Sequence, residues 1–182
     1  ISSQEKEYAA LETYTFKVLD PLQIKNGAAT TELKYTPENG AILIETAARI
    51  MGGAPLSLSN ELFGYTQLSL TTLSYLSPHL FFRVTALPQP PVKQFGMAVM
   101  LISDAEGELK ANIDTCKLEK LKTLHSYVLE VSKGSRLKKT TDSLTSPGEI
   151  YLLSSDKSAL IADYREIRKI ESEGLYRNIV VE

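Results

Sequence analysis

The sequence contains few of the residues on which common catalytic and metal sites depend. Its 182 residues include one cysteine, two histidines and no tryptophan. Because Cys116 is the only cysteine, no internal disulfide can form, and a reducing compartment such as the cytoplasm is the expected location. His79 and His125 are 46 residues apart in the sequence, with no cysteine or paired carboxylates near either of them, which argues against a zinc site.

Long hydrophobic runs and a strong excess of one charge are also absent. The longest apolar run, 95–102, is far shorter than the roughly 20 residues that span a bilayer, and it predicts a buried strand. A formal net charge of -2 and a pI near 5.8 give no long-range attraction to nucleic acid or anionic lipid. The sequence therefore predicts neither a nucleic-acid partner nor a membrane partner.

Two glutamates on either side of a turn are the most informative feature that is present. Glu32 lies in a β-rich run, Glu45 lies in a second run, and residues 36–41 between them include proline, asparagine and glycine. This composition predicts a β-hairpin. With a four-residue loop over 37–40, Glu32 would lie directly opposite Glu45 on the same face of the hairpin.

Two other loop lengths lead to different geometries. A two-residue turn at Asn39 and Gly40 would place Glu32 opposite Ala47, which keeps it on the same face as Glu45 as a diagonal neighbour. A three-residue loop would direct the two carboxylates to opposite faces, because a register shift of one residue reverses the side-chain direction.

Alternation along the second strand predicts two different faces. Glu45, Ala47 and Arg49 would point one way, and an apolar face would be formed by Ile42, Ile44, Thr46 and Ala48. Like charges opposite each other destabilise a ladder unless a cation lies between them, and a hard divalent cation takes oxygen ligands. The same residues also fit an ordinary solvated hairpin face with a surface ion pair, so both interpretations stay open.

Three segments of this region resemble the C-terminal half of the ATP site of ATP-grasp ligases, in particular amino-acid ligases of the dipeptide-synthase and carnosine-synthase type. These are Asn-Gly-Ala-Ala-Thr-Thr-Glu at 26–32, Ile-Glu-Thr-Ala-Ala-Arg at 44–49, and Ile-Met-Gly-Gly-Ala-Pro at 50–55. The stretches 137–152 and 163–168 are similar to the small C-terminal domain of these ligases.

The resemblance implies a role for each matching residue. Glu32 and Glu45 would bind Mg²⁺, or Mn²⁺ in its place, that bridges the phosphates of ATP. Arg49 would be the catalytic residue, in contact with the transferred phosphoryl group, while Gly52 and Gly53 would let backbone amides approach a phosphate closely. The family usually has histidine where this sequence has Thr30, which removes one expected substrate contact.

The implied activity is that of a carboxylate–amine ligase, which forms an amide from a small amino-acid or carboxylate substrate through an acyl phosphate. The chain begins at Ile1, and no upstream substrate-binding or lysine-bearing lobe is recognisable, so we expect a C-terminal fragment. Such a fragment would need the upstream ATP-grasp lobes as partners and would be inactive without them. The alternative is a non-catalytic regulatory or interaction module, and a homodimer is left open.

The expected fold class is α+β, with an antiparallel sheet and packed helices followed by a small α+β domain. A proline-rich seam within 87–92 predicts domains at 1–87 and 92–182. A helix is predicted over 4–22, and a single second helix would begin at Ser59 and be closed by Pro78.

Beyond the seam, strands are predicted at 96–102, 109–113, 127–132 and 149–153. A short charged helix is expected over 116–124. A final helix, capped by Ser155 or Asp156, would continue to Gly174.

Overall fold

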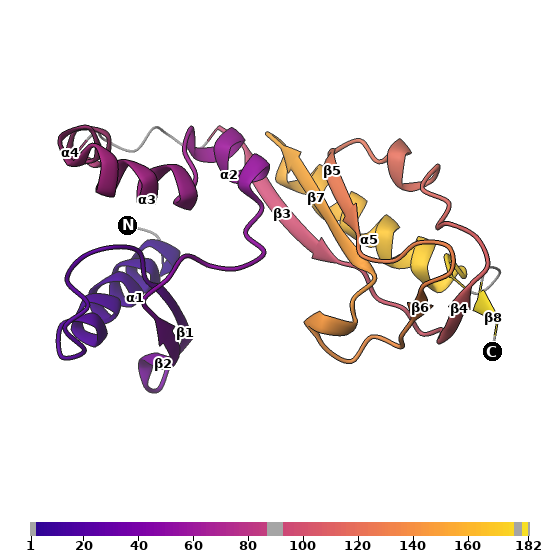
Figure 1. Ribbon diagram of the computed structural model, residues 1–182, viewed down its shortest axis with the longest axis horizontal. Helices are drawn as coiled ribbons and strands as arrows, with labels where there is room; N and C mark the ends of the chain where they lie inside the picture. The colour runs from indigo at the N-terminus through magenta and orange to yellow at the C-terminus, as the bar shows by residue number, and fades with distance from the viewer. Residues whose placement is uncertain (1–2, 87–92, 177–179, 182) are drawn as a thin grey trace. The chain divides into compact units, whose positions relative to one another are not determined.

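A computed structural model describes residues 3–86, 93–176 and 180–181. The chain forms two compact units, one from 1–56 with 65–89 and the other from 57–64 with 90–182 (Figure 1). All strand pairs are antiparallel, and helices pack on the strands, which confirms the predicted α+β class. The proline-rich seam that led to the predicted domain boundary lies outside the described residues.

Within the first unit, one helix packs against a β-hairpin. Helix α1 (Ser3–Leu19) contacts both strands of the hairpin, β1 (Thr30–Thr36) and β2 (Gly40–Ala47). Leu33 and Leu43 pair across the ladder and are half-buried, which places the apolar side of the hairpin on this face. Every buried residue among the described ones belongs to the second unit, so the first unit has no buried core of its own.

The single second helix predicted from Ser59 to Pro78 is wrong, because three helices occupy this region. They are α2 (Leu56–Phe63), α3 (Gln67–Leu76) and α4 (Pro78–Thr85). Gly64, with a φ of 75°, follows the end of α2, and Thr66 then caps α3 through reciprocal hydrogen bonds with Ser69. Pro78 begins α4 instead of ending a helix, since a missing N–H costs nothing in the first turn.

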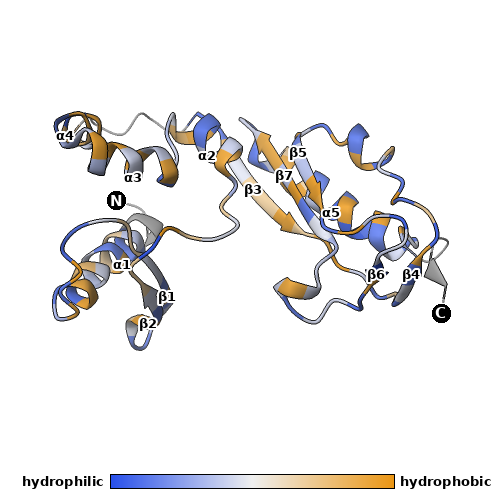
Figure 2. Ribbon diagram, viewed as in Figure 1, coloured by the Kyte–Doolittle hydropathy of each residue, from blue (hydrophilic) through white to orange (hydrophobic). Residues whose placement is uncertain are grey.

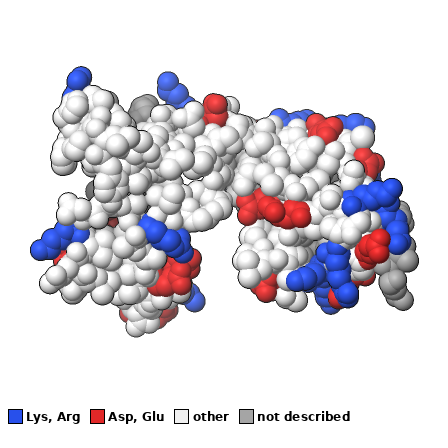
Figure 3. Space-filling model, viewed as in Figure 1, with Lys and Arg blue, Asp and Glu red and all other residues white. Residues whose placement is uncertain are grey.

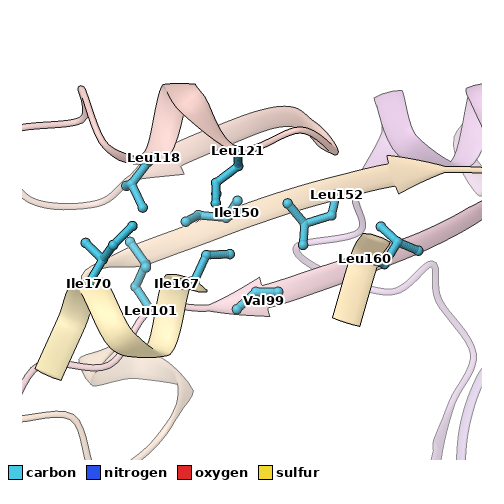
Figure 4. Packing of buried hydrophobic residues seen from close by; sticks show 9 residues of the cluster. All are labelled: Val99, Leu101, Leu118, Leu121, Ile150, Leu152, Leu160, Ile167 and Ile170. Atoms are coloured by element: carbon cyan, nitrogen blue, oxygen red, sulfur yellow. The ribbon is translucent and has the colours of Figure 1, made fainter. Parts of the chain in front are cut away.

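The core of the second unit lies between a three-stranded sheet and helix α5 (Lys157–Ser172). The strand order is β3 (Phe95–Met100), β7 (Gly148–Ser154) and β5 (Leu124–Leu129). Figure 4 shows the buried side chains that meet between them: Val99, Leu101, Leu118, Leu121, Ile150, Leu152, Leu160, Ile167 and Ile170. Each large side chain buried in this way contributes about 1.5 to 3 kcal/mol, so this cluster dominates the stability of the unit.

A second sheet and two short 3₁₀ turns complete this unit. Strands β6 (Arg136–Leu137), β4 (Gly107–Leu109) and β8 (Val180–Val181) pair in that order. Turns η1 (Leu118–Lys120) and η2 (Ser143–Thr145) lie in the connections. The strand predicted at 109–113 and the helix predicted at 116–124 are therefore wrong in extent, because β4 ends at Leu109 and η1 has only three residues.

The hydropathy pattern agrees with this arrangement. Strand β7 is predominantly hydrophobic, whereas α5 carries both hydrophobic and hydrophilic residues, as expected for a helix with one covered face (Figure 2). Within the described residues, no helix is long and apolar enough to cross a membrane.

Three acidic residues fix α5: Asp156 caps its start, and the buried Asp163 and Glu171 attach it to residues next to the sheet. Asp156 caps the helix, accepting a hydrogen bond from the Ser158 N–H at 2.8 Å, which confirms one of the two predicted caps. Asp163 accepts from both the N–H and the hydroxyl of Thr123. Glu171 accepts from the Ile102 N–H at 2.6 Å and pairs with Arg168 at 2.7 Å.

Replacing Glu171 should destabilise the second unit strongly. The change Glu171→Ala leaves the Ile102 N–H without its acceptor and the partly buried Arg168 without its ion-pair partner, which should cost about 2 to 4 kcal/mol. The matched control is Glu173→Ala, two residues further on, whose ion pairs with Lys117 and Lys169 are exposed and should contribute less than about 1 kcal/mol. Urea unfolding measures both, and equal losses would contradict this assignment.

Candidate functional site

The hairpin brings Glu32 and Glu45 directly opposite each other. Their Cα atoms are paired in the β1–β2 ladder, as the sequence predicted. The route to this pairing differs from the prediction, because Thr36 pairs with Gly40 and the loop has three residues, not four. Gly40 has a φ of 68°, the left-handed conformation that closes a three-residue turn.

A β-bulge restores the pairing that this shorter loop would otherwise remove. The register shifts by one residue between Glu32 and Leu33, where Ile44 is the extra residue on β2. Without the bulge, the Thr36–Gly40 register would place Glu32 opposite Ile44 and direct Glu45 to the other face. The one-residue offsets of the turn and the bulge cancel, so both glutamates share one face.

The same bulge overturns part of the predicted face assignment. Ile42 pairs with Lys34, so it lies on the glutamate face, and Ile44 is 62% exposed, so neither belongs to a covered apolar face. Thr46, which pairs with Thr31, does lie on the opposite face, with a hydroxyl–hydroxyl distance of 2.9 Å. Lys34 is the residue of this face that the sequence analysis missed, although strand alternation from Glu32 could have found it.

The two carboxylates are exposed and have no partner in the part of the chain that the structure describes. Among the described residues, neither makes a hydrogen bond or an ion pair, and Lys34 on the same face does not pair with them. Side chains directly opposite in an antiparallel ladder have Cβ atoms about 5 Å apart, and two like charges at this distance are destabilising. The hairpin therefore carries an unfavourable interaction that a bound cation would relieve.

Arg49 and the two glycines follow directly after β2. The Arg49 Nη1 donates to the Ile50 carbonyl at 3.0 Å, so in this structure the guanidinium contacts its own segment and not the glutamates. Gly52 and Gly53 form an exposed turn, and an added Cβ at either position would meet nothing within 4 Å. The space over this turn is open, which a ligand would need in order to reach the backbone amides.

The donor set fits Mg²⁺ held together with a nucleotide better than it fits a metal held by protein alone. Among the described residues there is no group of three or more His, Cys, Asp or Glu side chains that could hold a metal ion. Magnesium is commonly bound by one or two carboxylates, with waters and substrate phosphates completing an octahedral shell. Glu32 and Glu45 supply that number of carboxylates and leave the remaining positions open.

The other reactive side chains do not form a competing site. Cys116 is exposed, and its hydrogen bond to Asp114 raises the pKa of the thiol, which disfavours the reactive thiolate. His79 is exposed and His125 is half-buried on a different unit. On the face of the second unit seen in Figure 3, acidic and basic side chains are mixed, without a broad area of one sign.

Comparison with known proteins gives matches to several ligases and synthetases. Dapdiamide A synthase from Enterobacter agglomerans is 28% identical over 176 residues, which cover 96% of this chain and 41% of that protein. The structure of L-amino acid ligase from Bacillus licheniformis matches with a TM-score of 0.74 and 19% identity, over 93% of this chain and 43% of the ligase. No family model matches the chain.

A further match widens the range of enzymes that share this fold. Phosphoribosylglycinamide synthetase from Anaerococcus prevotii matches with a TM-score of 0.69 and 17% identity, over 93% of this chain and 42% of the synthetase. The predicted resemblance to ATP-grasp ligases is confirmed. The chain spans less than half the length of each of these ATP-grasp relatives.

Removing one of the two opposed charges should stabilise the metal-free chain. The change Glu45→Gln keeps the size of the side chain and removes the repulsion from Glu32, so the free energy of unfolding should rise by roughly 0.2 to 1 kcal/mol at low salt. Glu38→Gln, in the exposed hairpin turn, is the control and should have a smaller effect. Thermal unfolding in EDTA measures the difference, and a clear destabilisation by Glu45→Gln would show that the carboxylates do not repel each other.

Proposed function

We propose that this chain is the metal- and phosphate-binding C-terminal part of an ATP-dependent carboxylate–amine ligase that forms an amide through an acyl phosphate. The observation that carries the proposal is the facing pair Glu32 and Glu45, followed by Arg49 and an open diglycine turn, in a chain with an ATP-grasp-like fold. The names of two relatives, dapdiamide A synthase and L-amino acid ligase, support a ligase acting on amino-acid-like substrates.

Each residue of the site has a separate task in this proposal. Glu32 and Glu45 would hold Mg²⁺, which supplies positive charge to the phosphate oxygens of ATP when bound. Arg49 would leave its contact with the Ile50 carbonyl and form charge-assisted hydrogen bonds to the transferred phosphoryl group. The backbone N–H groups at Gly52 and Gly53 would donate to a phosphate or a carboxylate, since no side chain blocks the approach.

The structure of the first unit supports the need for upstream lobes. Its described residues include no buried core residue, yet many of its large apolar side chains are exposed. The most exposed are Tyr8, Phe16, Ile44, Tyr75, Leu76 and Phe82. Because the relatives are more than twice as long as the matched region, we propose that their additional chain corresponds to lobes that complete the ATP site and cover this surface.

Calorimetric titration with Mg·ATP tests whether the site works. The chain should bind Mg·ATP, and ATP in the presence of EDTA should bind at least about tenfold more weakly, because a carboxylate pair repels the nucleotide without the metal. Glu32→Gln and Glu45→Gln should each lose this magnesium dependence. In a polypeptide that includes the upstream lobes, Glu45→Gln should abolish ATP-dependent amide formation.

The controls separate the ligase from a scaffold that has only kept the fold. Glu38→Gln, on the turn of the same hairpin, should bind Mg·ATP like the unmodified chain. Absence of Mg·ATP binding at millimolar concentrations by the isolated chain would fit either a fragment that needs its upstream lobes or a scaffold. The same absence in a polypeptide that includes these lobes would favour the non-catalytic module instead. Full turnover by Glu45→Gln at ordinary magnesium concentrations would reject the assignment of the metal site.

The two glycines should respond differently to substitution by alanine. Gly52 lies outside the left-handed region and has open space around it, so Gly52→Ala should change stability by less than about 0.5 kcal/mol while weakening Mg·ATP binding. Gly53 has a φ of 66°, so Gly53→Ala should cost about 1 to 2 kcal/mol of local stability. Urea unfolding and calorimetry on the same samples check both expectations, and unchanged affinity in Gly52→Ala would show that no ligand approaches this backbone.

A further inference from the structure

The segment between β2 and the diglycine turn is held almost entirely by side chains. Three successive backbone carbonyls each accept a side-chain hydrogen bond: Arg49 from Thr30 at 2.9 Å, Ile50 from Arg49 at 3.0 Å, and Met51 from Gln67 at 2.7 Å. Since this segment belongs to neither helix nor strand, the orientation of its peptide planes depends on these donors.

Gln67 makes the most specific of these contacts. Its Nε2 donates to the Met51 carbonyl, and its Oε1 accepts from the Met51 N–H at 2.9 Å, so one primary amide satisfies both polar groups of a single residue. Gln67 is the first residue of α3 after the Thr66 cap, whose reciprocal bonds with Ser69 fix the backbone from which its side chain extends. The amide is thus presented to Met51 from a rigid position.

Thr30 provides a second attachment from the strand that carries Glu32. Its hydroxyl donates to the carbonyl of Arg49, and strand alternation places Thr30 and Glu32 on the same face of β1. Residue 30 is the position at which this sequence departs from the usual histidine of the ligases that it resembles. In this chain the side chain at that position supports the Arg49 segment.

From these contacts we propose that Gln67 and Thr30 are positioning residues that orient the Arg49–Gly53 segment for phosphate. The proposal rests on the function proposed above, because it assumes that this segment receives the phosphates of Mg·ATP. Gln67 fixes the peptide planes on both sides of Met51, directly before Gly52, and Thr30 fixes the carbonyl of Arg49. The hydrogen bonds are exposed to solvent, so their loss should alter local geometry more than global stability.

The first experiment tests the hydrogen bonds between Gln67 and Met51 in the free chain, without any ligand. In Gln67→Met, which keeps the length of the side chain but removes both polar atoms, NMR amide exchange at Met51 should become about tenfold faster, as expected when one hydrogen bond is lost. The control is Gln94→Met, an exposed glutamine that makes no hydrogen bond among the described residues. Unchanged exchange at Met51 in Gln67→Met would overturn the proposal whether or not the chain binds a nucleotide.

The second experiment measures the consequence for binding. On titration with Mg·ATP, the NMR amide signals of Gly52 and Gly53 should shift. In Gln67→Met, the Mg·ATP concentration that gives half of the full shift should be about tenfold higher, while the melting temperature changes little. If Gln67→Met needs the same Mg·ATP concentration as the unmodified chain, the proposed role of Gln67 is wrong, although the proposed function could still hold. No shift, either in the unmodified chain or in a polypeptide that includes the upstream lobes, would instead contradict the proposed function, and with it the assignment of the segment to phosphate.

Conservative variants distinguish positioning from general packing. Thr30→Ser keeps the hydroxyl that donates to Arg49 and should bind Mg·ATP like the unmodified chain, whereas Thr30→Val keeps the shape and should bind more weakly. Gln67→Glu separates the two bonds, because its carboxylate can still accept from the Met51 N–H but cannot donate to the Met51 carbonyl. Exchange at the Met51 amide should therefore be slower in Gln67→Glu than in Gln67→Met at the same pH. Equal Mg·ATP binding by Thr30→Ser and Thr30→Val would argue against the hydroxyl contact.

Discussion

The antiparallel pairing of β1 and β2 is the constraint on which the candidate site depends. It holds two exposed glutamates at directly paired positions of the ladder, where like charges are destabilising, and neither has a partner among the described residues. The arrangement persists because the cost is small compared with the hydrogen-bonded ladder and the packing of α1 against both strands. In the proposed function, this exposed pair supplies oxygen ligands to a metal ion.

The two units are stabilised by different kinds of contact. The second unit contains the buried cluster between α5 and the β3–β7–β5 sheet, with buried carboxylates such as Asp163 attaching the helix to the sheet. In the first unit, exposed hydrogen bonds from side chains such as Thr30 and Gln67 define the geometry of the segment after β2. The unit with the candidate site is therefore the one whose shape depends on individual polar contacts, which is why single substitutions there should affect binding more than unfolding.

Much of the local structure could be predicted from particular residues. The proline, asparagine and glycine at 36–41 predicted the hairpin, and Asp156 was one of the two predicted caps of α5. The region 59–78 was predicted wrongly because its apolar residues fit one helical period, while the break depends on Gly64 and the Thr66 cap. Pro78 was interpreted as the end of a helix, although proline is equally suited to the first turn of the next one.

The sequence by itself determined which residues could form the site, because two glutamates, an arginine and a diglycine follow a hairpin signal in a fixed order. It could not determine the register, since a three-residue turn alone would have separated the carboxylates and only the bulge at Ile44 returns them to one face. The contact of Gln67 with Met51 was also decided by tertiary structure, because it requires the start of α3 to lie beside the segment that follows β2. Periodicity describes neighbours along one element, whereas bulges and contacts between elements arise from how the whole chain packs.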